Sequence, residues 1–325
     1  MTSEWCRGRR IFVTGASGFV GTHLVRRLAD EGADVHVLAR HGRTALDARV
    51  TVHQGDLLDS GSLRIALAAA RPSVVFHLAA YGARPDEGDR QLMTETNVGG
   101  SVNLWNGIPD VVTKFVMTGT CREYAPADGP VDESYPCGPA RAYPATKHAA
   151  STLLAALASE DGRPFVLLRL FGPYGPGDET DRIIPFTIRR LLAGEGVPIT
   201  GGEQRYDFAY IDDHVNALLL AARLDSTRLV SVFNIGGGES RSLRAVLEDV
   251  ARAVGPDARA RLEFGAVPYR PGDTHALCAD ISAARSVLGY EPAVSLEEGL
   301  ARTVAWHRAR RHRVSPAPVT QAGYR

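Results

Sequence analysis

Three glycines near the start of the chain constrain its fold more than any other feature. They are Gly15, Gly18 and Gly21 in the stretch TGASGFVG, which follows the apolar run RIFVT and precedes the helical pattern FVGTHLVRRLAD. Glycines at such a strand-to-helix turn let backbone N–H groups at the helix N-terminus approach a pyrophosphate. Because the turn opens the first strand–helix–strand unit, we predict a dinucleotide site at these glycines together with Phe19 and Val20.

Short β-branched runs alternate with longer helical patterns through the first 170 residues. RIFVTG is followed by DVHVLAR, VTVHQGD, SVVFHLAA, KFVMTGT and FVLLRLFG. Repeated strand–helix units need right-handed crossovers and give a parallel sheet covered by helices on both faces. We therefore predict an α/β fold with a doubly wound parallel (Rossmann) sheet over 1–169. A smaller C-terminal substrate-binding part over 170–310, a returning segment near 206–235 and a mobile tail over 311–325 complete the predicted organisation.

Composition narrows the class of partner. The 325 residues include 37 basic and 37 acidic side chains, so no overall charge attracts nucleic acid or a membrane surface. No apolar run approaches the length of a membrane-spanning helix. The four cysteines show no metal-ligand spacing, so we expect no metal, a reducing cytoplasmic location and a small-molecule substrate.

A tyrosine and a lysine have the spacing of a catalytic pair. Tyr143 and Lys147 lie four residues apart in AYPATKHAA, which places them on one face of a helix. A lysine ammonium and an oxidised nicotinamide would lower the tyrosine pKa from its usual value near 10. The resulting phenolate could accept a hydroxyl proton while hydride leaves carbon, which predicts alcohol oxidation.

The glycine turn and the Tyr143–Lys147 pair, in this order, resemble the extended short-chain dehydrogenases/reductases, and the resemblance spans roughly residues 10 to 308. It implies that Thr120 hydrogen-bonds the reacting hydroxyl and that the chain could form a homodimer. It also implies a set of cofactor-binding residues that comprises Asp56 and Leu57 at adenine, Leu78, Ala79 and Ala80 beneath the ribose and nicotinamide, and Asn97.

The identity of the cofactor depends on the end of the second predicted strand. An acidic residue there normally hydrogen-bonds the adenosine ribose, but VLAR offers Ala39 and Arg40. Arg40 could favour a 2′-phosphate. We expect NAD, and NADP stays open.

Three later segments resemble the nucleotide-sugar epimerase/dehydratase branch of this family. They are LRLFGPYGPG, GGEQRYDFAYIDD and VPYRPGD. The resemblance implies that Arg205 and Arg270 bind the diphosphate of a UDP-sugar and that Asp273 binds its nucleoside. Guanidinium groups suit phosphate. Gly172 stands where the branch often has an asparagine.

The stretch TGTCREY bears on which reaction follows oxidation at the sugar C4. Relatives that are 4,6-dehydratases have an aspartate and a glutamate after the threonine, and epimerases have small or apolar residues, whereas this chain has Cys121, Arg122 and Glu123. If the segment is extended, Cys121 and Glu123 face the same side. The thiol could then act as acid and the carboxylate as base.

This combination resembles the 5,6-dehydratases that process UDP-N-acetylglucosamine in antibiotic (tunicamycin) biosynthesis. The resemblance implies C4 oxidation, loss of water across C5 and C6, and return of hydride to C4. Alternatives stay open: Cys121 could be a packing residue, and Glu123 could pair with a neighbouring cation. The rival activities are 4-epimerase, 4,6-dehydratase and 4-ketoreductase, and a rival of another class is a non-catalytic NAD(P)-sensing protein.

Overall fold

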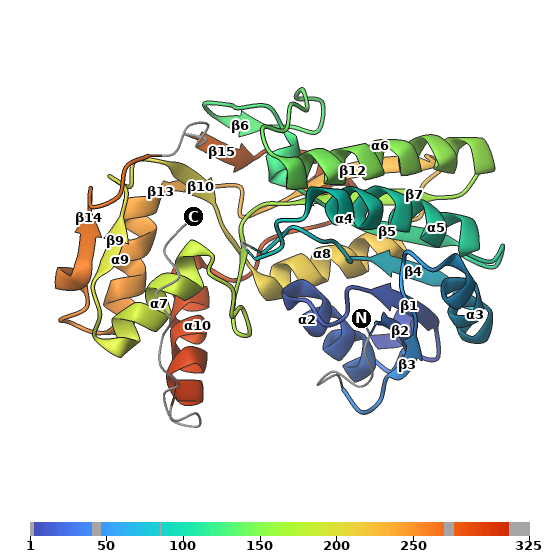
Figure 1. Cartoon of the computed structure of the whole chain (residues 1–325), viewed down its shortest axis with the longest axis horizontal. Helices are drawn as coiled ribbons and strands as arrows, with labels where there is room; N and C mark the ends of the chain where they lie inside the picture. Colours follow the sequence, from blue (N-terminus) through green and yellow to red (C-terminus); the bar gives the residue numbers. More distant parts are fainter. Residues whose placement is uncertain (1–2, 41–46, 85, 270–275, 312–325) are drawn as a thin grey trace.

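Seven parallel strands form the central sheet of the computed structural model, which describes residues 3–40, 47–84, 86–269 and 276–311 (Figure 1). Their order is β12-β7-β5-β4-β1-β2-β3, and every neighbouring pair is parallel. The order reverses between β1 and β4, which is the switch point where ligands bind in such sheets. The predicted α/β doubly wound fold is confirmed. The strands are β1 (Arg10–Thr14), β2 (Asp34–Ala39), β3 (Thr51–Gln54), β4 (Val74–His77), β5 (Lys114–Thr120), β7 (Phe165–Leu170) and β12 (Val230–Ile235).

Successive side chains along these strands point to opposite faces of the sheet and pack into two separate hydrophobic cores. In β5, Val116 lies in the core beneath one set of helices, while Phe115 and Met117 lie in the core on the opposite face. The first face is covered by α2 (Phe19–Asp30) and α8 (Ile211–Arg223). The second face is covered by α3 (Ser60–Ala70), α5 (Gly100–Gly107) and α6 (Ala142–Asp161). Short helical segments complete this part: α1 (Ser3–Cys6), α4 (Arg90–Thr94), the π-helix η1 (Glu95–Gly99) and the 3₁₀ turn η2 (Cys121–Glu123).

A second lobe has its own core, which lies beside the sheet in Figure 1. Its helices α7 (Ile183–Ala193), α9 (Leu243–Val254) and α10 (Leu296–Arg311) pack on one another. Small strand pairs surround them: β8 (Pro173–Tyr174) with β11 (Ala209–Tyr210), and β9 (Val197–Ile199) with β14 (Leu262–Phe264). A four-stranded sheet consists of β13 (Ser240–Ser242), β10 (Arg205–Asp207), β15 (Ala276–Ala279) and β6 (Pro130–Val131), and η3 (Arg259–Arg261) and η4 (Ala284–Leu288) are short helical turns.

The chain crosses between the two lobes more than once. After β7 it builds α7, β9 and β10 of the second lobe, and then α8 and β12 return to the central sheet. Contacts of the second lobe with α2 identify the sheet edge that it faces: His23 Nε2 lies 2.7 Å from Pro176 O, and the Arg182 guanidinium lies 5.3 Å from the centre of the Phe19 ring. The carboxyl ends of β1, β4 and β5 therefore face the second lobe.

Candidate active site

The glycine turn makes a close backbone approach that larger residues would block. Gly15 has φ 73°, and a Cβ there would lie 2.5 Å from Ala79 N. A Cβ on Gly21 would overlap Gly15 O. The turn after β1 therefore lies directly against the chain that leaves β4, as the switch point of the sheet requires.

Helix α2 begins at this turn with its first N–H groups uncapped by any side chain. Gly18 is the N-cap, with extended φ and ψ angles, and it makes no side-chain cap hydrogen bond. Its own N–H donates to Gly15 O at 3.0 Å, which closes the turn. Phe19 and Val20, in the first turn, are half-buried. Free N–H groups and the positive end of the helix dipole suit a pyrophosphate.

An open depression of about 440 Å³ lies where the adenosine end of a dinucleotide is expected. It brings together Arg40 after β2 and Asp56 after β3, and Ser62 at the start of α3 lines it as well. One oxygen of Asp56 accepts from Leu58 N at 2.9 Å, so the second oxygen can accept from a ligand. Leu57 is only 6% exposed, because its side chain packs into the core against α5.

Beneath the predicted nicotinamide position, a buried chain of hydrogen bonds fixes the end of β4. The Ser101 hydroxyl donates to Asn97 O at 2.5 Å, so it must accept from His77 Nε2 at 2.8 Å. His77 Nδ1 is then the acceptor for the Thr14 hydroxyl at 2.7 Å. Burial lowers the pKa of His77 to about 3, and the ring stays neutral as this pattern requires. Leu78, Ala79 and Ala80 follow directly and are half-buried.

Asn97 lies in the π-helix η1 and connects the loop after β4 to the helix that carries the tyrosine–lysine pair. Its amide oxygen accepts from Tyr81 N at 2.7 Å, and its amide nitrogen donates to Tyr81 O at 2.8 Å and to Thr146 Oγ1 at 2.9 Å. The residue is 2% exposed. Asn97 therefore holds the loop after β4 against α6. This structural role adds to the cofactor-binding role that the resemblance implies.

Tyr143 and Lys147 both lie in the first turns of α6, and burial shifts both of their pKa values. Lys147 is 2% exposed, and desolvation lowers the pKa of its ammonium to about 8, opposed by the nearby Glu123 carboxylate. Desolvation raises the pKa of Tyr143 to about 12, although Arg182 acts in the opposite direction. Without a cofactor, burial outweighs the surrounding cations. The predicted fall in the tyrosine pKa requires an oxidised nicotinamide beside Lys147 and stays a prediction for the cofactor-bound enzyme.

The segment after Thr120 is not extended, so the condition under which Cys121 and Glu123 would face the same side is not met. Residues 121–123 form the 3₁₀ turn η2, closed by a capping box between Thr120 and Glu123. Thr-x-x-Glu is the sequence signature of such a box. Cys121 and Glu123 do not share the face of a strand, and the signature was readable in TGTCREY.

The two ends of this turn have different surroundings. The Thr120 hydroxyl accepts from Arg122 N at 3.3 Å and also interacts with the Cys121 thiol, and its proton can turn to a ligand in place of the sulfur. The Glu123 side chain is 0% exposed: one oxygen accepts from Thr120 N at 2.8 Å, and the other lies 3.3 Å from Arg169 Nε. In this conformation the carboxylate does not reach the surface on which a sugar would lie.

Cys121 is half-buried next to Thr120. Desolvation raises the pKa of its thiol to about 11; the Arg122 charge opposes this rise and the Asp207 carboxylate adds to it. The thiol is therefore protonated at neutral pH and is available as a proton donor.

Arg169 is a residue at the site that the sequence analysis missed. It lies in β7, is 7% exposed, and its guanidinium stacks 4.5 Å from the centre of the Tyr124 ring. It also approaches the Cys137 thiol, with 3.2 Å between Nη2 and Sγ. An arginine inside the apolar run FVLLRL indicates a buried anionic partner, because an unpaired buried charge is costly.

The residues predicted to bind the diphosphate are only partly described. Arg205 is exposed in β10, where its guanidinium donates to the side chain and carbonyl of Ser240. Arg270 and Asp273 lie outside the described residues. A side chain at Gly172, which has φ 40°, would overlap Asp207 O, so the asparagine of the relatives does not fit this backbone.

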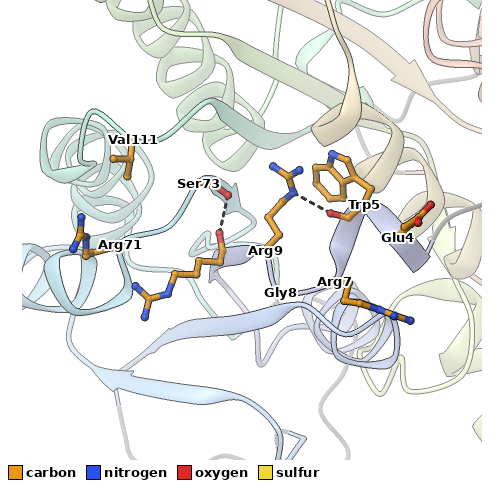
Figure 2. A pocket seen from close by; sticks show the side chains of 9 residues that line it. Glu4, Trp5, Arg7, Gly8, Arg9, Arg71, Ser73 and Val111 are labelled. Carbon is orange, nitrogen blue, oxygen red and sulfur yellow. Dashed lines mark hydrogen bonds between the residues drawn. The ribbon is translucent and has the colours of Figure 1, made fainter.

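A larger depression of about 560 Å³ lies at the opposite, amino edge of the sheet (Figure 2). Four arginines contribute to its lining, but Figure 2 shows Arg7 and Arg71 pointing in different directions and Arg9 lying along Trp5. No cofactor-binding or catalytic residue predicted from the sequence lines it.

Comparison with known proteins identifies the class. The chain belongs to the NAD dependent epimerase/dehydratase family, whose model matches residues 11–236. The predicted extended short-chain dehydrogenase/reductase relationship and its cofactor, NAD, are thereby confirmed, and the glycine turn fits that cofactor. Within the described residues, no helix is long and apolar enough to span a membrane, and no three side chains form a metal-ligand cluster.

Particular relatives carry out different reactions. A dTDP-glucose 4,6-dehydratase of Actinoplanes sp. is 30% identical over 93% of this chain and 98% of its own length. The UDP-glucose 4-epimerase of Thermotoga maritima, solved with UDP-glucose, is 29% identical with a TM-score of 0.83, covering 92% of this chain and 99% of its own. MoeE5, solved with UDP-glucose and NAD, is 33% identical with a TM-score of 0.82 over 92% and 99% of the two chains.

Proposed function

We propose that the chain oxidises a UDP-sugar at C4 as the first step of its reaction. The observation that carries this proposal is that α6, which bears Tyr143 and Lys147, packs against the η2 turn that follows Thr120. When bound, NAD supplies the hydride acceptor and later the hydride donor. Thr120 donates a hydrogen bond to the reacting oxygen. Tyr143 accepts the hydroxyl proton as a phenolate, which the Lys147 ammonium and the positive charge of oxidised NAD would stabilise against the effect of burial.

The second step that we propose is loss of water across C5 and C6 of UDP-N-acetylglucosamine, after which hydride returns to C4. Cys121 supports this step, since its protonated, half-buried thiol adjoins Thr120 and can protonate the departing C6 hydroxyl. The resemblance assigns C5 proton abstraction to Glu123. That role requires the carboxylate to leave Thr120 N and Arg169 when the sugar binds.

The buried state of Glu123 favours a second candidate, a UDP-sugar 4-epimerase. An epimerase returns hydride to the opposite face of the 4-keto sugar and needs no base at C5. The Glu123 carboxylate has no exposed surface and is already bound by a backbone N–H and a guanidinium. This arrangement fits the simpler reaction.

Incubation with UDP-N-acetylglucosamine in deuterated water, followed by proton NMR, separates the two. Exocyclic methylene signals are expected for the dehydration. Inversion at C4 without loss of water would establish the epimerase and refute the elimination. A 6-methyl-4-ketone would identify a 4,6-dehydratase instead.

We also propose a cytoplasmic location and a homodimer for the active enzyme. The four cysteines, all of which are free thiols, support a reducing compartment. Light scattering of the purified chain tests the dimer, and a monomeric mass at working concentration would refute it.

A further inference from the structure

Glu123 and Arg169 form a buried ion pair next to Thr120 and Cys121, the residues that are proposed to contact the sugar. Glu123 is 0% exposed and Arg169 is 7% exposed, and the carboxylate Oε2 lies 3.3 Å from the guanidinium Nε. The other carboxylate oxygen accepts from Thr120 N at 2.8 Å. A buried carboxylate of this kind is costly without a cation. Arg169 Nε is closer to it than His148 Nδ1, which lies 3.9 Å from the same oxygen, and the Lys147 charge also acts on it, so Arg169 is the main support of the cap on Thr120.

A glycine near the end of β5 leaves room for this pair. Gly119 lies opposite Arg169 in the parallel register of β5 and β7, and Thr120 lies opposite Leu170. A Cβ on Gly119 would be 2.5 Å from Glu123 Oε1 and 3.4 Å from Arg169 Cγ. The carboxylate therefore fills the space above a glycine, between the end of β5 and the arginine of β7.

Two further contacts hold the guanidinium in one orientation, and a third fixes the tyrosine on which it stacks. It stacks on the Tyr124 ring at 4.5 Å, and its Nη2 lies 3.2 Å from Cys137 Sγ. The Tyr124 hydroxyl in turn donates to Asn234 Oδ1 in β12 at 2.7 Å. Arg169 thus connects the segment after β5 to two neighbouring strands of the sheet, β7 and β12.

We infer that Arg169 is a positioning residue for the sugar-oxidation step. By neutralising and orienting Glu123, it fixes the N–H and the hydroxyl of Thr120, and the 3₁₀ turn presents Thr120 and Cys121 to the substrate. The sugar-oxidation part of this inference rests on the proposed C4 chemistry. The structural part, that Arg169 holds the Thr120 amide, stands without it.

Amide hydrogen exchange at Thr120 tests the structural part without a substrate. Arg169→Met is expected to speed exchange of this amide about tenfold or more, because its acceptor is no longer held. Arg169→Lys keeps the positive charge and is expected to retain most of the protection. In the Glu123→Gln/Arg169→Met double variant, a neutral amide oxygen can still accept from Thr120 N, so protection is expected to return and the protein to fold even if Arg169→Met does not.

Kinetics test the positioning role. Arg169→Met is expected to lower kcat for C4 oxidation about tenfold or more, while KM and NAD affinity change less than about twofold. In a Thr120→Ala background the same change is expected to cost less than about twofold, because Arg169 acts through Thr120. Arg10→Met, which removes a partly exposed arginine–aspartate pair with Asp34 at the amino end of β1, is the control and is expected to leave kcat unchanged.

Unchanged Thr120 exchange in Arg169→Met would overturn the inference, and so would additive losses in the Thr120→Ala background. If no UDP-sugar is oxidised by the native chain but Thr120 exchange responds as expected, the proposed function fails and the role of Arg169 in the fold is supported.

Discussion

The carbonyl oxygen of Gly15 occupies the space that any side chain at position 21 would need. Both residues belong to the turn between β1 and α2, where the first N–H groups of the helix are uncapped. Loss of either glycine would move the backbone that approaches the pyrophosphate, so this contact links the fold of the first βαβ unit to cofactor binding.

Gly21→Ala is therefore expected to abolish measurable NAD binding, because the methyl group overlaps Gly15 O. Gly18→Ala is the matched control in the same motif, since its Cβ would lie 3.3 Å from Gly15 O, which a small shift relieves. Calorimetric titration with NAD measures both. Equal affinity of the two variants would contradict the steric argument.

Gly119→Ala is expected to displace the Glu123 carboxylate, since the new Cβ would be 2.5 Å from its Oε1. We expect kcat to fall about tenfold or more with NAD affinity preserved, because the turn that carries Thr120 and Cys121 loses its cap. Gly129→Ala provides the control, because nothing lies within 4 Å of a Cβ there. A fully active Gly119→Ala enzyme would show that the cap is dispensable.

Stability at alkaline pH should report the burial of Lys147. Its pKa is lowered from 10.5 to about 8, so at this side chain the unfolded chain binds more protons between these values, and the contribution of Lys147 to the free energy of unfolding rises with pH across that window. The gain is at most about 3 kcal/mol. Urea unfolding without cofactor at pH 7.5 and pH 10.5 measures it, and Lys147→Met should lack this increment. Parallel pH curves for the two proteins would contradict the assignment.

Arg40 should influence the choice between NAD and NADP. It lines the depression that contains Asp56, at the position where an acidic residue would bind the ribose diol. Arg40→Asp is expected to weaken NADP binding about tenfold or more, because a carboxylate repels the 2′-phosphate, while NAD binding is kept. Fluorescence titration with both cofactors tests this. Equal losses for the two would indicate that Arg40 does not reach the ribose.

Asp207 should be a stability residue of the second lobe. Its carboxylate accepts from Gly237 N at 2.6 Å, Gly238 N at 3.0 Å and Ala279 N at 3.1 Å, and the residue is 3% exposed. Asp207→Asn turns an NH₂ group toward these donors and is expected to cost about 1–3 kcal/mol in urea unfolding. The exposed Asp212→Asn is the control and should change stability little. Equal stability of the two variants would contradict this role.

Much of the fold was predictable because hydrophobic periodicity is local. The alternating runs place β1, β2, β4, β5 and β7 correctly, and a parallel sheet follows from the connections between them. The same holds for the glycine turn. The capping box could also be recognised in the sequence, as Thr120-x-x-Glu123, although the sequence analysis considered only what an extended segment would imply.

The pKa shifts and the ion pair of the site could not be predicted from local sequence patterns. Desolvation raises the pKa of Tyr143 to about 12, and its extent depends on how many atoms surround the phenol in the folded chain. Arg169 is distant in sequence from Glu123, and only the register of β5 and β7 places it beside Gly119.

Local sequence patterns were enough to predict the class of fold, the glycine turn and the tyrosine–lysine pair, since each depends on residues within a few positions of one another. Tertiary structure alone decided that Glu123 is buried against Arg169 while Cys121 stays half-exposed. The physical reason is that burial and ion pairing depend on which strands become neighbours. A seven-residue stretch carries no information about the strand that lies beside it.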